Sequence, residues 1–304
     1  MNSTPLAREQ QRKMKLSVPP PSNETLRIVR RLLRKRSAQI GGGIFLVLVF
    51  LALFGPQITP YDPFNITIEQ RLSPPSMQHI FGTDEQGRDL FSRIIYGARY
   101  ALLVMIFTTI IGAIGGLGLG IPSAYFGGWA DMLVMRLMDV MLGFPYILLI
   151  LAIVAILGPS LTNSMVAIGM ANIPTFARLV RSVILVVKEQ DFITAERALG
   201  AGPIRIMLRN IIPNILSPII VYISLTMPTA VLAAASLSFL GLGAQPPLPE
   251  WGTMMVNARD FIVTAPWVVL APGLTIFVVV LGINLFGNAL RDVLDPRDTT
   301  GRKN

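Results

Sequence analysis

The chain alternates between long stretches without any charged side chain and short stretches in which charges are concentrated. An unpaired charge in the bilayer costs several kcal/mol, so charged residues mark where membrane-spanning helices end. About 20 apolar residues suffice for one crossing. The pattern therefore predicts a protein that crosses a membrane several times. The charge-free stretches cover residues 37–61, 100–130, 140–177, 210–249 and 261–290.

The third charge-free stretch, residues 140–177, is too long for one crossing and contains a break. Gly158, Pro159 and Ser160 form a helix-ending sequence in its middle. We therefore expect six spanning helices, and the predicted fold class is an all-α polytopic membrane protein. The expected helices cover residues 38–58, 99–122, 133–157, 161–182, 213–240 and 267–290.

Positive charges are divided unequally between the two sides of these helices. Six crossings place both termini on one side, where the segments carry 21 Lys and Arg residues, whereas the other side carries 5. Cytoplasmic segments hold the excess of Lys and Arg in membrane proteins. We therefore expect both termini in the cytoplasm, with the first helix as an uncleaved anchor, because no small-residue cleavage site follows a short apolar core.

Much of the net charge of +9 belongs to the predicted basic cytoplasmic tail, residues 1–37, which holds 10 of the 26 Lys and Arg residues. Between arginines in this tail, Leu26, Val29, Leu32 and Leu33 recur at helical spacing. They predict an amphipathic elbow helix along an anionic lipid surface, although a basic flank that only sets orientation has the same composition. No recognition helix or aromatic interleaving accompanies the charges, so we expect no nucleic-acid partner.

The chain has few of the residues on which thiol chemistry and metal binding commonly depend. It has no Cys and one His, His79, for which we expect a solvated position in the first outer loop. No G-x-x-x-x-G-K-[ST] phosphate loop is present. The expected spans hold almost no ionisable relay residues, and Arg136 and Asp139, one turn apart, are expected to pair. We therefore expect no enzyme activity, no catalytic residue, no cofactor and no metal site.

Three glycines recur at every fourth position of the second expected helix. Gly112, Gly116 and Gly120 form overlapping G-x-x-x-G spacings. Such spacings let two membrane helices approach closely, so they predict a tight helix contact.

The segment between the fourth and fifth expected helices, residues 189–214, predicts two short helices joined at a rigid corner. The first covers residues 191–199 with an apolar face, Gly200 ends it, and Pro203 suits the first turn of the second. We expect this knob to project from the membrane and to insert into a partner's groove. The residues expected to carry the contact are Phe192, Ala195, Glu196, Arg197, Leu199, Gly200, Arg205 and Pro213.

This segment resembles the coupling loop of membrane-spanning permease subunits of ATP-binding-cassette importers. That loop has the pattern E-A-A-x-x-x-G, followed by nine residues and a motif ending in Pro, and Gly200 and Pro213 fall at the matching spacing. The chain has Thr194, Ala195 and Glu196 where the pattern has Glu-Ala-Ala. Moving a carboxylate by two residues rotates it about 200° around a helix. Ala195 and Gly200 therefore carry over, whereas Glu196 departs from the pattern.

Two further segments resemble the second permease subunit of dipeptide, oligopeptide, nickel and glutathione importers. They are HIFGTDEQGRDLFSRIIYGAR, residues 79–99, and SLSFLGLGAQPPLPEWGTMM, residues 236–255. The resemblance implies a type I importer transmembrane domain in the bacterial inner membrane. It places a permease core at residues 97–291 with a coupling loop at 189–213. Around this core lie a first helix and outer loop at 38–96, and cytoplasmic tails at 1–37 and 292–304.

The same resemblance implies partners. They are a second permease subunit in a heterodimer, two ATPase subunits, an external solute-binding protein, membrane lipid and a peptide-like substrate. A nickel importer of the same family is the alternative within this class. A secondary carrier or channel acting alone, and a membrane scaffold without transport activity, are the alternatives outside it.

Two outer segments contain candidate functional residues. Asp84 with Arg88 and Asp89 with Arg93 are expected to form i,i+4 ion pairs that hold a short helix before the second span, for anchoring or for gating. A later segment is expected to be a loop beside the translocation path, with its tryptophan at the membrane interface. Its candidate residues are Pro246, Pro247 and Trp251.

Overall fold

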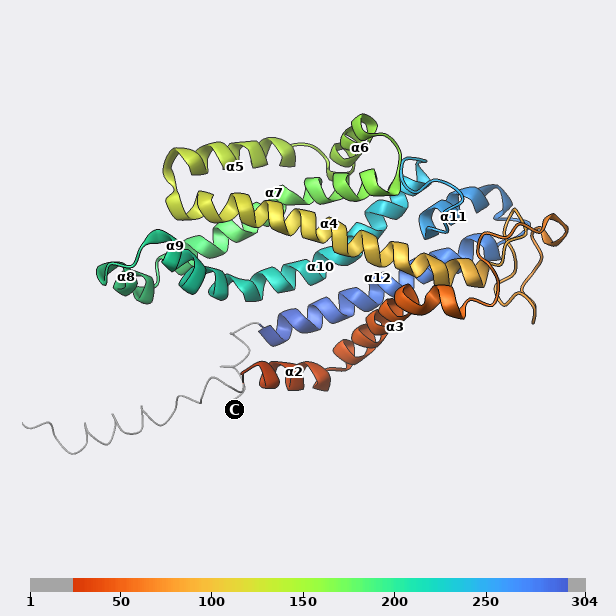
Figure 1. Cartoon of the computed structure of the whole chain (residues 1–304), viewed down its shortest axis with the longest axis horizontal. Coiled ribbons are helices and arrows are strands. Elements are labelled where there is room, and N and C mark those ends of the chain that lie inside the picture. Colours follow the sequence, from red (N-terminus) through yellow and green to blue (C-terminus); the bar gives the residue numbers. More distant parts are fainter. Residues whose placement is uncertain (1–23, 295–304) are drawn as a thin grey trace, which may run out of the picture.

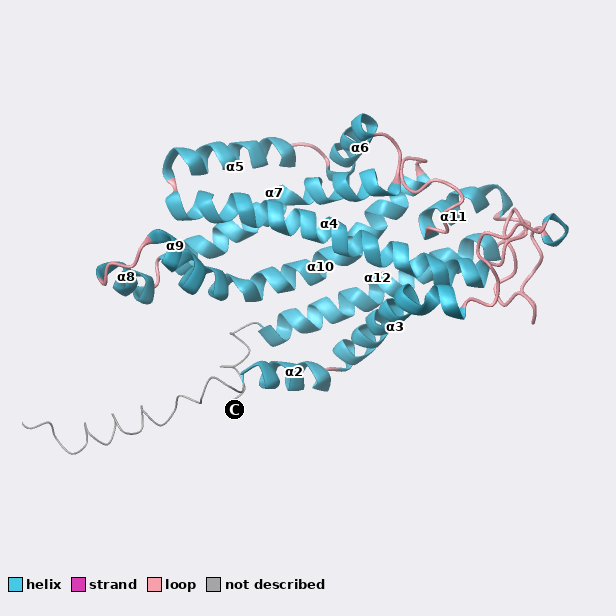
Figure 2. Ribbon diagram, in the orientation of Figure 1, coloured by secondary structure: helices cyan, strands magenta, loops and turns pink. Residues whose placement is uncertain are grey.

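The computed structural model describes residues 24–294, which form a bundle of α-helices (Figures 1 and 2). Residues 1–23 of the predicted tail 1–37 and residues 295–304 of the predicted tail 292–304 lie outside the described residues. The long helices are α3 (Arg36–Ile58), α4 (Leu90–Phe126), α7 (Leu161–Lys188), α10 (Ile212–Phe239) and α12 (Trp267–Leu294). The shorter ones are α2 (Glu24–Arg34), α5 (Gly128–Leu142), α6 (Tyr146–Leu157), α8 (Asp191–Ala198), α9 (Pro203–Ile206) and α11 (Trp251–Ala258).

Five helices in the described part of the chain are long and apolar enough to cross a membrane, and α5 with α6 could form a sixth span. The prediction of one continuous third helix over residues 133–157 is wrong, because α5 and α6 are bent by 94° at a short break. The break contains Gly143, Phe144 and Pro145. Proline has no backbone N–H, and it disfavours helical geometry at the residue before it. The predicted third helix is therefore two helices with a sharp bend between them.

Most predicted boundaries agree with the structure to within a few residues, but α4 begins nine residues before the expected start at residue 99. Asp89 explains the early start, since its carboxylate accepts a hydrogen bond from the backbone N–H of Ser92. An acidic side chain at this position satisfies one of the unpaired donors of the first helical turn. The helix can therefore begin at the charged residues, before the charge-free stretch.

The glycine spacing of α4 forms the predicted tight helix contact, with α7 as the partner. A Cβ atom on Gly116 would lie 2.2 Å from Cβ of Phe176, and one on Gly120 would lie 2.8 Å from the carbonyl oxygen of Ala177. Such distances are too short for any side chain, so the backbones meet only because these positions are glycine. The prediction of close packing is confirmed.

The two ends of the bundle differ. At one end, α8 and α9 project beyond the other helices, while α11 and residues 59–89 cover the opposite end (Figure 1). We call these the α8 end and the α11 end. The predicted amphipathic helix forms as α2, and its Val29 and Leu33 are exposed.

Candidate functional site at the two ends of the bundle

The α8 end carries the predicted knob. Gly200 follows α8 with a φ of +79°, and its backbone N–H bonds to the carbonyl of Arg197 at 2.9 Å. This left-handed geometry is easily adopted by glycine and costly for other residues. Gly200 thus ends the helix and forms the corner, as the sequence predicted. The second short helix differs from the prediction, because α9 continues through a π-helical turn at Met207–Ile211 into α10.

The knob has an exposed face and a buried anchor. The predicted contact residues Phe192, Ala195 and Leu199 are all exposed, and 85% of Leu199 is accessible. Ile193, which the sequence reasoning did not single out, is fully buried among isoleucines of α7, α9 and α10. Burying one large aliphatic side chain contributes about 1.5–3 kcal/mol. The exposed apolar face is therefore presented on a firmly packed support.

Among the other residues predicted to contact a partner, Arg197, Arg205 and Pro213 are exposed and Glu196 is half-buried.

Polar contacts join this end to α4 and α5. Lys188, the last residue of α7, donates a hydrogen bond to the carbonyl of Tyr125 at 2.7 Å. Asp139 forms its ion pair with Arg178, at 2.5 Å. The expected pairing of Arg136 with Asp139 is therefore wrong, since a residue on a neighbouring helix reaches the carboxylate instead. Both contacts bind α7, which leads directly into α8, to the preceding helices.

At the α11 end, Asp84 organises a tight turn. Its carboxylate accepts hydrogen bonds from Arg88 Nε at 2.7 Å, from the backbone N–H of Arg88 at 3.0 Å and from that of Gln86 at 2.8 Å. Gly87 in the same turn has a φ of +74°. The predicted contact of Asp84 with Arg88 is confirmed, but the predicted short helix is wrong. A turn that needs left-handed backbone at glycine takes its place.

Asp89 and Arg93 do not form the predicted pair. Asp89 caps α4, and its other oxygen lies 2.9 Å from Nδ1 of His79. Arg93 donates to the carbonyl of Pro63 at 2.8 Å and lies 3.4 Å from the carboxylate of Asp84. Both carboxylate oxygens of Asp89 are engaged, one by the backbone N–H of Ser92 and the other by His79, and neither pairs with Arg93. The buried Arg93 instead joins the 59–89 segment to α4.

His79 is buried, with 7% of the residue accessible, and the expectation of a solvated histidine is wrong. Its two ring nitrogens face Asp89 and Gln70, at 2.9 and 3.2 Å. The ring also lies against Tyr61, with 4.9 Å between ring centroids. The histidine therefore binds the 59–89 segment to the cap of α4.

The proline-containing loop leads into α11. Pro246 and Pro247 are exposed there, in the expected loop conformation. Trp251 is buried at 3% accessibility, and its indole N–H bonds to the carbonyl of Ile94 at 3.1 Å. A Cβ atom on Gly97 would lie only 2.5 Å from this indole nitrogen, so the glycine makes room for the ring. The expectation of an interfacial tryptophan is wrong, because α11 packs Trp251 against α4.

Two family models match most of the chain. Residues 116–299 match the model described as "Binding-protein-dependent transport system inner membrane component". Residues 25–75 match the model described as "N-terminal TM domain of oligopeptide transport permease C". The chain belongs to the family of binding-protein-dependent transport system inner membrane components. It is thus a multi-pass inner membrane permease, as the resemblance of its coupling segment predicted.

Curated permeases of transport systems match this chain over most of its length. The dipeptide transport system permease protein DppC of Alkalihalophilus pseudofirmus is 46% identical and covers 92% of this chain and 94% of its own. The di/tripeptide permease DppC of Pseudomonas aeruginosa is 48% identical over 85% and 88% of the two chains. The glutathione permease GsiD of Escherichia coli O157:H7 is 45% identical over 88% and 89%.

A solved structure supports the fold. The inward-facing MetNI methionine ABC transporter matches with a TM-score of 0.56 and 19% identity, covering 67% of this chain and 96% of that chain. The permease therefore has the fold of an ABC importer transmembrane domain.

Proposed function

We propose that this permease forms the translocation path of an ATP-driven importer for peptides, together with a second, different permease subunit. Two ATPase subunits bind the α8–α9 knobs of the pair, and an external solute-binding protein delivers the substrate at the α11 end. The relatives named for dipeptide, di/tripeptide and glutathione transport support a peptide-like substrate. The excess of Lys and Arg supports placing both termini and the knob on the cytoplasmic side.

The observation that carries the coupling role is the exposed apolar face of a rigid knob. Phe192 and Leu199 are exposed to the surroundings, while Ile193 fixes α8 to the rest of the bundle. An amphipathic helix with this arrangement fits an apolar groove in a partner. ATP binding and hydrolysis in the partners would displace the knob as a rigid body, and the permease would exchange outward- and inward-facing states.

Affinity purification of the permease with its native partners tests the coupling role. Leu199→Asp places a charge on the exposed face, and a charge buried without a partner in an interface costs several kcal/mol. We expect the recovered ATPase subunits to fall about tenfold or more, since each 1.4 kcal/mol is a factor of ten. Val263→Asp is the matched control, because Val263 is equally exposed, at 88%, near the α11 end. Equal recovery with both variants would overturn the coupling role.

Uptake by vesicles containing the purified complex tests the transport role. ATP on the ATPase side should drive entry of a labelled dipeptide or glutathione when the solute-binding protein is supplied. A proton gradient without ATP should drive none. Uptake by the permease alone under a proton gradient would identify a secondary carrier instead.

A further inference from the structure

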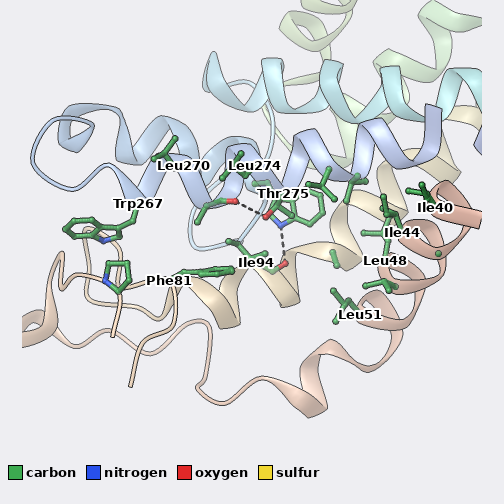
Figure 3. A pocket seen from close by; sticks show the side chains of 18 of the residues that line it. Ile40, Ile44, Leu48, Leu51, Phe81, Ile94, Trp267, Leu270, Leu274 and Thr275 are labelled. Carbon is green, nitrogen blue, oxygen red and sulfur yellow. Dashed lines mark hydrogen bonds between the residues drawn. The ribbon is translucent and has the colours of Figure 1, made fainter. Parts of the chain in front are cut away.

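An apolar groove of about 830 Å³ opens between α3 and α12 (Figure 3). One wall is the face of α3 that carries Ile40 and Val47, and the other is the face of α12 that carries Leu270 and Leu274. Ile94 of α4 lies in its floor. Nothing in the transport mechanism described above uses this groove.

The groove exists because α3 and α12 cross tightly and then diverge. At the crossing, a Cβ atom on Gly41 would lie 2.3 Å from the carbonyl oxygen of Gly282, so the two backbones are in contact. Farther along, α3 packs on α4 instead, where a Cβ atom on Gly55 would lie 3.0 Å from the Ile95 side chain. The space between the helices is therefore a wedge. Phe81 and Trp267 lie at its α11 end (Figure 3).

Both walls belong to helices that are long and apolar enough to cross the membrane, so hydrocarbon surrounds the mouth of the groove. The lining residues Ile40, Val47, Leu270 and Leu274 are all exposed at that mouth. Apolar side chains without neighbours lose the dispersion contacts that a filled space would give. A hydrocarbon chain from the bilayer supplies these contacts with no unsatisfied polar group.

The other end of the groove is basic. Arg36, Ile40, Gly43 and Val47 follow one another at helical spacing and therefore share one face of α3. Arg36 is exposed and makes no ion pair within residues 24–294, whereas the neighbouring Lys35 binds Asp292 at 2.9 Å. Exposed arginines of α2 lie just before this point: Arg30, Arg31 and Arg34. Guanidinium groups followed by an apolar groove complement a phospholipid, whose phosphate is followed by an acyl chain.

We propose that the groove binds one acyl chain of an anionic phospholipid, whose phosphate is held by Arg36 and the arginines of α2. The lining of α3 runs from Gln39 to Leu51, which is about 18 Å at 1.5 Å per residue. Half of a hydrocarbon core about 30 Å thick is about 15 Å. A chain of the leaflet on the α2 side is therefore long enough to cover most of the α3 wall, whereas Phe81 and Trp267 lie beyond its reach at the α11 end.

A transmembrane helix of a partner is a poorer fit to the same space. The groove narrows to backbone contact at the Gly41 crossing, next to the basic end. A flexible chain a few ångströms wide can follow the groove into this narrow part, whereas a helix about 10 Å across cannot.

Photo-crosslinking tests the acyl-chain site. The complex, in nanodiscs of phosphatidylcholine with a small fraction of phosphatidylglycerol, is labelled with a phosphatidylglycerol that carries a diazirine on its acyl chain. Peptide mapping should place the crosslinks on α3 and α12 at the groove, well above those at Ile114, which is exposed on α4. Crosslinks no more frequent at the groove than at Ile114 would mean ordinary annular lipid and would overturn the proposal.

A blocking variant adds a control for folding. A Cβ atom on Gly43 meets no atom within 4 Å, so Gly43→Leu fills the groove without a clash. We expect the crosslinks in the groove to fall about tenfold, because displacing a few methylenes removes at least that much affinity. Gly118→Leu is the matched control, since Gly118 on α4 is also open within 4 Å. Equal yields in the two variants would overturn the acyl-chain site.

The selectivity of crosslinking for the lipid headgroup tests whether Arg36 binds the phosphate. Arg36→Gln should reduce the preference for the phosphatidylglycerol probe over a matching phosphatidylcholine probe, and Arg291→Gln, an exposed position near the end of α12, should leave it unchanged. An equal preference in both variants would remove Arg36 from the site. A disulfide between Val47→Cys and a cysteine in the second permease, formed at high yield, would show that a partner helix occupies the groove instead of lipid.

Discussion

The guanidinium of Arg181 binds the carboxylate of Asp131 through two hydrogen bonds, with Nε 2.7 Å from Oδ1 and Nη2 2.6 Å from Oδ2. Asp131 lies in the first turn of α5, and Arg181 lies two turns before the end of α7. The two parallel hydrogen bonds fix the relative orientation of these helices as well as their distance. Since α7 leads into α8, displacement of the knob would carry the start of α5 with it.

Asp131→Asn should therefore impair transport more than folding. The pair is partly exposed, and such pairs contribute up to about 1 kcal/mol to stability. We expect a small drop in the unfolding temperature and a larger loss of peptide uptake per ATP hydrolysed. Arg181→Asp combined with Asp131→Arg should restore part of the uptake.

The control for this prediction is Asp260→Asn, which removes an exposed ion pair with Arg259 near the opposite end. It should leave coupling unchanged. If the double reversal transported no better than either single variant, the orientation of α5 by this pair would not matter for transport.

The stability of the α11 end should depend on pH through Glu85. Burial raises the pKa of this carboxyl, and the negative charge of Asp84 raises it further, although Arg88 lies 3.0 Å away. A raised pKa in the folded state means that the folded protein holds the proton more tightly than the unfolded chain. The contribution of protonated Glu85 to the stability of the folded protein is fully present below the ordinary Glu pKa of about 4.3. It is lost as the pH rises through the pKa that Glu85 has in the folded protein.

Glu85→Gln should accordingly flatten the pH dependence of unfolding above about pH 4.3 and leave the protein at least as stable at neutral pH. Thermal unfolding of the detergent-purified complex across this range measures the effect. Glu69→Gln provides the comparison, because Glu69 lies in the same 59–89 segment with its side chain exposed. A steeper pH dependence in Glu85→Gln would reverse the sign argued here.

Charge-free stretches located the spans well because a bilayer penalises charge wherever a helix crosses it. The knob was also predictable, since Gly200 and Pro203 act through local backbone geometry. The bend between α5 and α6 was missed because Pro145 carries no charge and lies inside a charge-free stretch. Its neighbours Gly143 and Phe144 give a signal that could have identified the break.

The α11 end was not predictable from spacing alone. The i,i+4 rule assumes a helix, whereas Gly82 and Gly87 with positive φ fold the chain back before α4 starts. That fold brings His79 to Asp89 and Arg93 to Asp84, over separations along the chain that no local pattern encodes. Ile193 was missed for a similar reason, because the partners that bury it come from α7, α9 and α10.

Gly116→Ala should destabilise the permease by about 1–3 kcal/mol, because the added methyl overlaps Phe176 and forces the packed helices apart. Gly118→Ala, half a turn away on the same helix, should be neutral or mildly stabilising, since its Cβ meets no atom within 4 Å. Thermal unfolding in detergent compares the two. Equal unfolding temperatures would mean that the contact between α4 and α7 contributes little.

Gly200→Val should weaken the recovery of ATPase subunits while leaving the unfolding temperature nearly unchanged. No atom lies within 4 Å of a Cβ at this position, so the cost is conformational, about 1–2 kcal/mol for a side chain at φ +79°. The strain falls on the corner between α8 and α9, outside the main bundle, and is relieved by tilting the exposed face of the knob. Gly202→Val isolates this effect, because Gly202 has a φ of −71° and equally open surroundings. With Gly200→Asn, the recovery of ATPase subunits should lie between those of Gly200→Val and Gly202→Val, since Asn tolerates the left-handed region better than Val. Matching losses at both positions would attribute the effect to bulk at the interface, and the geometry of the corner would then carry no coupling function.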